Sequence, residues 1–161
     1  MRKRKKIFCI LLSLFILIVS QTFTVWGSEI EWYDLREVNV DSQQIISYDE
    51  NSITPYARYI MGATVSIVES SSHEVMMRSE VFCTDEMKKI TTVFTLQKKS
   101  GSKWIDVGEG SVSVSNSTHM YKAMETTGVT SGTYRCIANT MVTSKSGYTE
   151  SVSVTSGQIV I

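Results

Sequence analysis

Apolar and polar residues alternate along most of the chain after position 58, in short runs separated by turn-forming residues. Alternation with a period of two places one set of side chains on each face of an extended strand. No stretch of this region repeats apolar residues at helical spacing over three turns. The pattern therefore predicts an all-β domain of seven or eight short strands, a sandwich or a barrel. The sets expected to share a strand face are Val75, Met77, Val81 and Cys83; Ile90, Thr92, Phe94 and Leu96; and Tyr134, Cys136, Ala138, Thr140 and Val142.

Four polar segments rich in serine and glycine are expected to form the turns between these strands. They are Ser-Ser-Ser at 70–72, Lys-Ser-Gly-Ser at 99–102, Gly-Glu-Gly at 108–110 and Ser-Lys-Ser-Gly at 144–147. Serine and glycine are favoured in turns because serine bonds to nearby backbone and glycine adopts positive φ at no steric cost. Since no helix is expected after 108–110, the glycines there do not predict a phosphate-binding loop.

The first 27 residues have the organisation of a secretory signal peptide. Five basic residues at 2–6 precede an apolar run over 7–19 that only Ser13 interrupts. Cleavage after Gly27 would place Val25 and Gly27 at the −3 and −1 positions, and Cys9 lies too early for a lipoprotein anchor. We expect a secreted, extracellular protein. The alternative is an uncleaved N-terminal membrane anchor that holds the protein facing outward, because the apolar stretch approaches the roughly 20 residues that span a bilayer.

Charge divides the remaining chain into an acidic N-terminal segment or linker at 28–57 and a domain at 58–161. Between positions 28 and 50, seven acidic residues face the single basic residue Arg36. Removal of the signal peptide takes away five of the 16 basic residues and none of the 16 acidic ones, which leaves 11 against 16 and a net charge of −5. A nucleic-acid-binding protein normally carries a basic patch. We therefore expect no nucleic-acid partner, and contact with a membrane only through an uncleaved signal segment.

The residues Gly-Thr-Tyr-Arg-Cys at 132–136 resemble the late-strand signature of immunoglobulin domains. The resemblance implies a tyrosine corner, in which the Tyr134 hydroxyl bonds to backbone just upstream. It also implies a bridge between Cys83 and Cys136, which would close a loop of about 53 residues and stabilise the fold by roughly 4 kcal/mol. The alternative is two buried free thiols. The expected fold is a single immunoglobulin-like antiparallel β-sandwich of about seven or eight strands, preceded by a signal-peptide helix and a polar segment.

A second resemblance covers more of the chain. The segments 53–60, 95–104 and 132–135, in this order after a signal peptide, resemble small secreted proteins of Gram-positive bacteria that form a domain-of-unknown-function family. The resemblance implies the type of host and an extracellular location. It brings no activity with it.

The sequence offers no catalytic, metal or cofactor site. His73 follows three serines, but adjacent residues on a turn do not aim a hydroxyl at an imidazole, and no Gly-x-Ser-x-Gly elbow is present. His119, the carboxylates and the cysteines lack zinc or calcium spacing. Trp104, beside the lysines of the 99–102 turn, is the candidate ligand contact, since a surface aromatic there could stack on a sugar ring or a peptide. The alternative is that it covers a sheet edge.

These observations predict a non-catalytic binding module that is secreted or associated with the cell surface, with a protein or a glycan as partner. The alternative is a structural or self-assembling protein, in which the apolar residues 158–161 or the acidic segment pair with a neighbouring chain, because an unpaired apolar strand is a template for association. A secreted toxin or bacteriocin is a more distant alternative.

Overall fold

A computed structural model describes residues 31–39 and 58–161 of the chain. The expected signal peptide, its cleavage site and most of the acidic segment lie outside these residues. The described residues form strands and turns, and no helix occurs among them. Within this part of the chain, no helix is long and apolar enough to cross a membrane.

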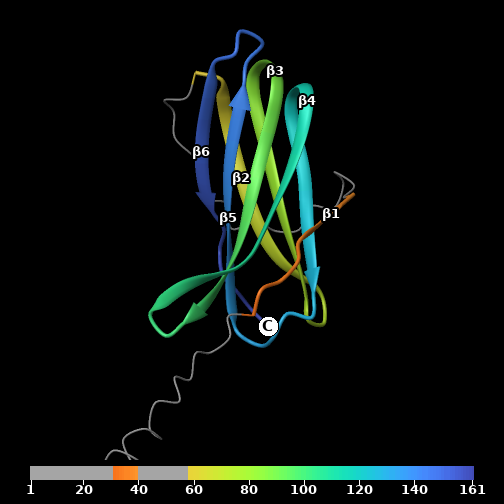
Figure 1. Cartoon of the computed structure of the whole chain (residues 1–161), viewed down its shortest axis with the longest axis vertical. Helices are drawn as coiled ribbons and strands as arrows, with labels where there is room; N and C mark the ends of the chain where they lie inside the picture. The colour runs from red at the N-terminus through yellow and green to blue at the C-terminus, as the bar shows by residue number, and fades with distance from the viewer. Residues whose placement is uncertain (1–30, 40–57) are drawn as a thin grey trace, which may run out of the picture. The chain divides into compact units, whose positions relative to one another are not determined.

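In the described residues, seven strands form one antiparallel sheet, which confirms the predicted all-β class (Figure 1). The path through the sheet runs β1-β4-β3-β5-β6, and β2 and β7 are added to β3 and β5. The sheet is open, because the two ends of this path do not pair with each other. The strands are β1 (Arg36–Val38), β2 (Ile60–Ser71), β3 (Glu74–Ser100), β4 (Lys103–Thr127), β5 (Thr133–Thr143), β6 (Thr149–Thr155) and β7 (Ile159–Val160).

Strands β3 and β4 form a long hairpin that bends in the middle. The first half of β3, up to Phe82, pairs with residues 119–127 of β4, and its second half, from Met87, pairs with residues 103–117. The bend falls at the register shift between Phe82 and Met87, where Asn116 of β4 has a φ of 51°. Figure 1 shows both strands turning back near the top of the view. The strands expected separately around residues 75–83 and 90–96 are therefore the two halves of one bent strand.

The strand faces predicted from the sequence form the core. Every side chain of the three expected sets is buried, and Phe94 and Tyr134 are the largest that are completely inaccessible to solvent. Strand β2 pairs with the first half of β3 and β5 pairs with the second half, yet all these strands contribute to one hydrophobic cluster. The bend in β3 and β4 thus lets a single sheet enclose a single core, which is what alternation along each strand requires.

Part of the acidic segment belongs to the sheet. Strand β1 pairs with residues 123–125 of β4. Just before β1, Tyr33 is 6% exposed and belongs to the core cluster, and its backbone N–H donates to the carbonyl of Val107 over 2.6 Å. The folded unit therefore includes residues 31–39 as well as the domain expected at 58–161.

The expectation of a turn at 108–110 is wrong, because these residues continue β4 without interruption. The two glycines make room for other segments of the chain. A Cβ on Gly108 would lie 2.8 Å from the carbonyl oxygen of Tyr33, and one on Gly110 would overlap the side chain of Met124. Here glycine permits the close approach of the Tyr33 backbone and of the Met124 side chain rather than a change of direction.

The substitution Gly108→Ala is expected to destabilise the protein by about 1–3 kcal/mol, because the added methyl group must displace the backbone at Tyr33. Urea unfolding measures this loss of free energy. The matched control is Gly62→Ala in β2, where an added Cβ has no atom within 4 Å. If Gly108→Ala proved as harmless as Gly62→Ala, residues 31–35 would not be packed on β4 as described.

Candidate functional site

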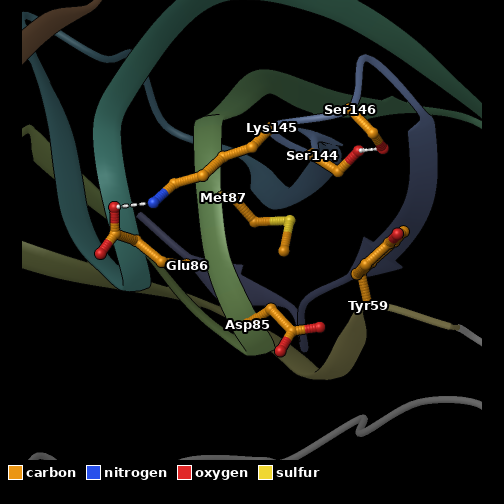
Figure 2. Close-up of a pocket in the computed structure, with 7 residues that line it drawn as sticks. All are labelled: Tyr59, Asp85, Glu86, Met87, Ser144, Lys145 and Ser146. Atoms are coloured by element: carbon orange, nitrogen blue, oxygen red, sulfur yellow. Dashed lines mark hydrogen bonds and ion pairs between the residues drawn. The ribbon is translucent and has the colours of Figure 1, made fainter.

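Three segments that are distant in sequence meet where β3 bends, and we call this group the loop end. It consists of residues 58–60 at the start of β2, residues 85–87 at the bend, and residues 144–148, which link β5 to β6. The predicted turn at 144–147 is confirmed, with Gly147 at a φ of 88°. The segments surround a half-open hollow of about 210 Å³ (Figure 2).

The carboxylate of Glu150 holds the start of β2 in place at the loop end. It accepts hydrogen bonds from the backbone N–H groups of Arg58, Tyr59 and Ile60, at 3.0, 3.0 and 3.1 Å. Glu150 lies on β6, directly opposite Val142 of β5. Hydrogen bonds to an ionised carboxylate are stronger than those between neutral groups. One side chain of β6 therefore fixes the backbone that carries the aromatic ring of Tyr59.

Two tyrosine rings and the guanidinium group of an arginine pack together at the loop end. The rings of Tyr59 and Tyr148 have centroids 5.7 Å apart and are tilted by 51°. The guanidinium carbon of Arg58 lies 5.2 Å from the centroid of the first ring and 5.8 Å from that of the second. These distances allow a cation–π attraction. Tyr148 remains 50% exposed, so a large aromatic surface faces solvent next to Tyr59, which lines the hollow.

The rest of the rim is polar and partly held by its own hydrogen bonds. Lys145 forms an ion pair of 2.7 Å with Glu86 across the hollow, as Figure 2 shows. The hydroxyl of Ser144 bonds to that of Ser146 at 2.9 Å and accepts the backbone N–H of Tyr148 at 3.0 Å. The ion pair joins the turn to β3. The hydrogen bonds of Ser144 fix the backbone from which the Tyr148 side chain extends.

The floor and the lower rim of the hollow differ in chemistry. Met87 is buried and supplies an apolar floor, which Figure 2 shows at the centre of the hollow. The exposed carboxylate of Asp85 has one weak side-chain contact, at 3.4 Å from the Thr84 hydroxyl. The loop end thus offers an aromatic surface, a small apolar depression and a carboxylate able to accept hydrogen bonds from a ligand.

Trp104, the candidate contact from the sequence, does not belong to the loop end. It lies opposite Lys99 on the hairpin between β3 and β4, and it is half-buried. The guanidinium carbon of Arg135 lies 4.3 Å from the centroid of its ring. The Arg135 Nε donates to Gln97, whose amide donates in turn to Asp106, each over 2.7 Å. This network holds the arginine against Trp104 and reduces the aromatic surface that a ligand could reach.

Tyr134 lies at the opposite end of β5, where its hydroxyl donates a 2.7 Å hydrogen bond to the carbonyl of Thr130. This is the bond that the tyrosine-corner resemblance implied. The backbone N–H of Thr130 donates to the hydroxyl of Tyr33, and Lys98 donates to the Thr130 hydroxyl over 2.6 Å. Burial raises the pKa of Tyr33 above its ordinary value. The cluster therefore joins Tyr33 of the N-terminal segment to Thr130, and Thr130 to Tyr134 of β5, through hydrogen bonds of the two tyrosine hydroxyls.

The bridge between Cys83 and Cys136 is not formed: both cysteines are buried, and both are free. Cys83 pairs with Ile60 near Glu150, which lies opposite Val142, whereas Cys136 is six positions earlier on β5. Six residues of an extended strand span about 20 Å, far more than the roughly 4–7 Å between the Cα atoms of a disulfide. Alternation predicted correctly that both side chains point inward. It carries no information about their positions along the strands.

Both thiols are expected to react slowly in the folded protein. Burial, and next the charge of Glu150, raises the pKa of Cys83 to about 11, and burial raises the pKa of Cys136 as well. The thiolate is the reactive form. Iodoacetamide should therefore modify neither thiol in the native protein near neutral pH, and both in denaturant without a reductant, as measured by intact mass. A disulfide that only a reductant opens would contradict the structure.

The same pKa shift predicts a loss of stability in alkaline solution. The unfolded thiol of Cys83 ionises near its ordinary pKa of 9.0, whereas the folded one keeps its proton up to about pH 11. Between these values the unfolded state binds fewer protons than the folded state, so the free energy of unfolding falls as pH rises. The Cys83→Ala variant should show a shallower decrease over this range in urea unfolding.

Neither histidine lies at the loop end. The Nδ1 of His73 lies 2.8 Å from the carbonyl oxygen of Val129, which bridges the turn after β2 to the segment after β4. His119 stacks on Phe82, with ring centroids 4.6 Å apart, and its Nε2 lies 3.0 Å from Glu80. In the described residues, no group of three histidine, cysteine or acidic side chains is placed to hold a metal ion.

Sequence reasoning did not find the two residues on which the loop end depends. Glu150 acts on backbone groups about 90 positions earlier, and no local pattern marks such a contact. Tyr148 did carry a signal, because it directly follows the Ser-Lys-Ser-Gly turn, where an aromatic side chain is presented from a loop.

A scan of protein-family models, a search of curated proteins and a search of solved structures each find no match to this chain.

Proposed function

We propose that this chain is an exported, non-catalytic interaction module that binds a protein partner at the cell surface through the loop end. In this proposal the bent sheet is an immunoglobulin-like sandwich, and the expected signal peptide and the resemblance to secreted Gram-positive proteins account for its location. The observation that carries the proposal is the exposed ring of Tyr148, held beside Arg58 and beside Tyr59, which lines the hollow.

The composition of the loop end supports a protein partner. Tyrosine, serine and glycine dominate the binding loops of antibody-like domains, because tyrosine supplies a large contact at low conformational cost and serine adapts its hydrogen bonds. Tyrosine and arginine are also enriched among the residues that dominate binding energy at protein interfaces. The segment 144–148 has the sequence Ser-Lys-Ser-Gly-Tyr, and Tyr59 and Arg58 lie next to it.

The size of the hollow also favours a protein partner over a free small molecule. Its volume of about 210 Å³ is below the roughly 300–1,000 Å³ of typical small-ligand sites. It is suited to one side chain of a partner, with Met87 beneath it and the Asp85 carboxylate at its rim. The aromatic pair then provides the surrounding contact.

Self-assembly through residues 158–161 has less support. Strand β7 already pairs with β5, where Ile159 lies opposite Tyr134 and Val160 opposite Thr133. The backbones of Gly132 and Ile161 exchange two further hydrogen bonds, at 3.1 and 2.9 Å. The segment that was expected to pair with a neighbouring chain therefore pairs with β5 of its own sheet.

The proposal predicts saturable binding of the labelled protein to intact cells of the organism that encodes it, and loss of that binding when the cells are treated with protease. Tyr148→Ala should weaken the binding at least tenfold, about 1.4 kcal/mol, as expected when a central aromatic contact is truncated. Trp32→Ala is the matched control, because Trp32 is 57% exposed but lies outside the loop end, and it should bind as the unaltered protein does.

Three results would overturn the proposal in different ways. Absence of saturable binding would exclude a surface partner on these cells. Binding that survives protease but is lost after periodate oxidation of cell-surface glycans would assign a glycan instead of a protein. Equal binding of the Tyr148→Ala and Trp32→Ala variants would place the contact elsewhere on the molecule.

A further inference from the structure

A broad uncharged surface lies on the outer face of the sheet, away from the core. Strand pairing places two successive rows of outward-facing residues across β4, β3, β5 and β6, and none of these residues carries a charge. The rows are Ser113, Thr91, Met141 and Ser151, and Ser111, Val93, Asn139 and Ser153. The next outward positions on the two sides bring the first charges, Lys89 and Glu109. We call these eight residues the neutral face.

The neutral face is hollowed over β5 and β6. The hollow has a volume of about 350 Å³, within the usual range of roughly 300–1,000 Å³ for small-ligand sites. Asn139, Ser151 and Ser153 line it and are exposed, and their side chains make no hydrogen bond to other described residues. Met141, 49% exposed, and Val93 supply its apolar surface.

The chemistry of this lining restricts what can occupy it. A charged ligand would lose hydration without meeting an opposite charge, which is costly. A purely apolar ligand would cover the Asn139 amide and two hydroxyl groups without giving them partners, and each buried unpaired group costs about 1–3 kcal/mol. The lining therefore suits an uncharged group that has hydroxyls or amides on one side and C–H surface on another. A sugar ring has this combination.

We infer that the hollow between Asn139, Met141 and Ser153 binds one unit of a neutral glycan. The C–H face of the ring packs on Met141 and Val93. The amide of Asn139, which can both donate and accept, bonds to neighbouring hydroxyls of the sugar, and Ser151 and Ser153 complete the polar side. The site is separate from the loop end and does not rest on the function proposed for it.

Two other occupants fit the neutral face less well. An extended peptide cannot join β5 as an added strand, because β5 is already paired with β3 on one side and with β6 on the other. A second copy of the chain would need a larger apolar surface, since a stable interface buries about 800 Å² on each partner. Among the exposed large hydrophobic residues in the described part of the chain, Met141 is the one that lies on this face.

The test is calorimetric titration of the exported chain with chitohexaose, cellohexaose and mannohexaose, and with a hyaluronan hexasaccharide as the charged comparison. We expect saturable binding of at least one neutral oligosaccharide and none of hyaluronan. Asn139→Asp keeps the shape of the side chain but adds a charge and removes two donors, so the affinity should fall at least tenfold. Ser151→Ala should also weaken binding, whereas Ser113→Ala, in the same row but outside the hollow, should not.

Tyr148→Ala separates this site from the loop end, because it should leave oligosaccharide binding unchanged. Failure of all three neutral oligosaccharides to bind, or equal affinities of the Asn139→Asp and unaltered proteins, would overturn the inference. Light scattering at increasing protein concentration tests the second copy. A dimer that the Met141→Lys substitution dissociates would assign the face to self-association and overturn the glycan site.

Discussion

Replacement of Phe94 by alanine is expected to cost about 3–5 kcal/mol of folding free energy, which is the usual loss for a fully buried phenylalanine. Phe94 has no exposed surface and lies on the second half of β3, opposite Gly110 of β4 and Ala138 of β5. Both neighbours are small, so they cannot fill the cavity by changing rotamer. A domain with a typical stability of about 5–15 kcal/mol would lose a large part of it.

The matched control for this substitution is Phe82→Ala, on the first half of the same strand. Phe82 is 43% exposed and stacks on His119 at the surface, so its loss should cost about 1 kcal/mol or less. Urea unfolding of both variants measures the difference. Equal destabilisation would mean that the two halves of β3 do not differ in burial as described, and that the bend is placed wrongly.

Replacement of Glu150 by alanine is expected to damage both stability and binding. The carboxylate accepts three backbone N–H groups from residues 58–60, and loss of hydrogen bonds to a charged group costs about 1.5–3 kcal/mol. At the exposed backbone N–H of Arg58, water can replace the lost hydrogen-bond partner. The expected total loss therefore stays at about 1.5–3 kcal/mol although three bonds are removed. Because the same bonds position Tyr59, the variant should also lose binding at the loop end, as is expected of Tyr148→Ala.

Glu86→Ala is the control for this second prediction, since it removes a carboxylate from the same end of the molecule. Its ion pair with Lys145 is exposed, and such pairs contribute about 0–1 kcal/mol. Urea unfolding and cell binding are measured for both variants. If Glu150→Ala were no more destabilising than Glu86→Ala, the start of β2 would be held by other contacts, and Glu150 would not be the residue that organises the loop end.

The local parts of the fold followed from the sequence because they depend on near neighbours in the chain. Alternation identified the buried faces of β3 and β5, including both cysteines, since the pleat of a strand places every second side chain on the same side. The turns around Gly101 and Gly147 also followed, because both glycines have positive φ and each links two strands that pair. The turn predicted at the Gly-Glu-Gly segment was wrong, because glycine also occurs where another part of the chain approaches a strand closely.

Contacts between distant segments did not follow from the sequence. Alternation determines which face of the sheet a side chain points to, but not its position along the strand. It therefore could not show that Cys83 and Cys136 lie far apart. The acidic composition of residues 28–57 favoured a linker, yet Tyr33 reaches the core because Gly108 lets its backbone approach β4. The partial covering of the Trp104 ring did not follow from the sequence either, because it depends on Arg135, which reaches the ring from β5.

The sequence by itself determined the all-β class, the buried faces of β3 and β5 and two of the turns that join the strands, because period-two alternation and turn-forming residues act within a few positions. Only the tertiary structure decided which strands pair, where β3 and β4 bend and which side chains meet at the loop end. The decisive contacts there join Glu150 to residues about 90 positions away. Such contacts depend on the register of the whole sheet, which no single segment encodes.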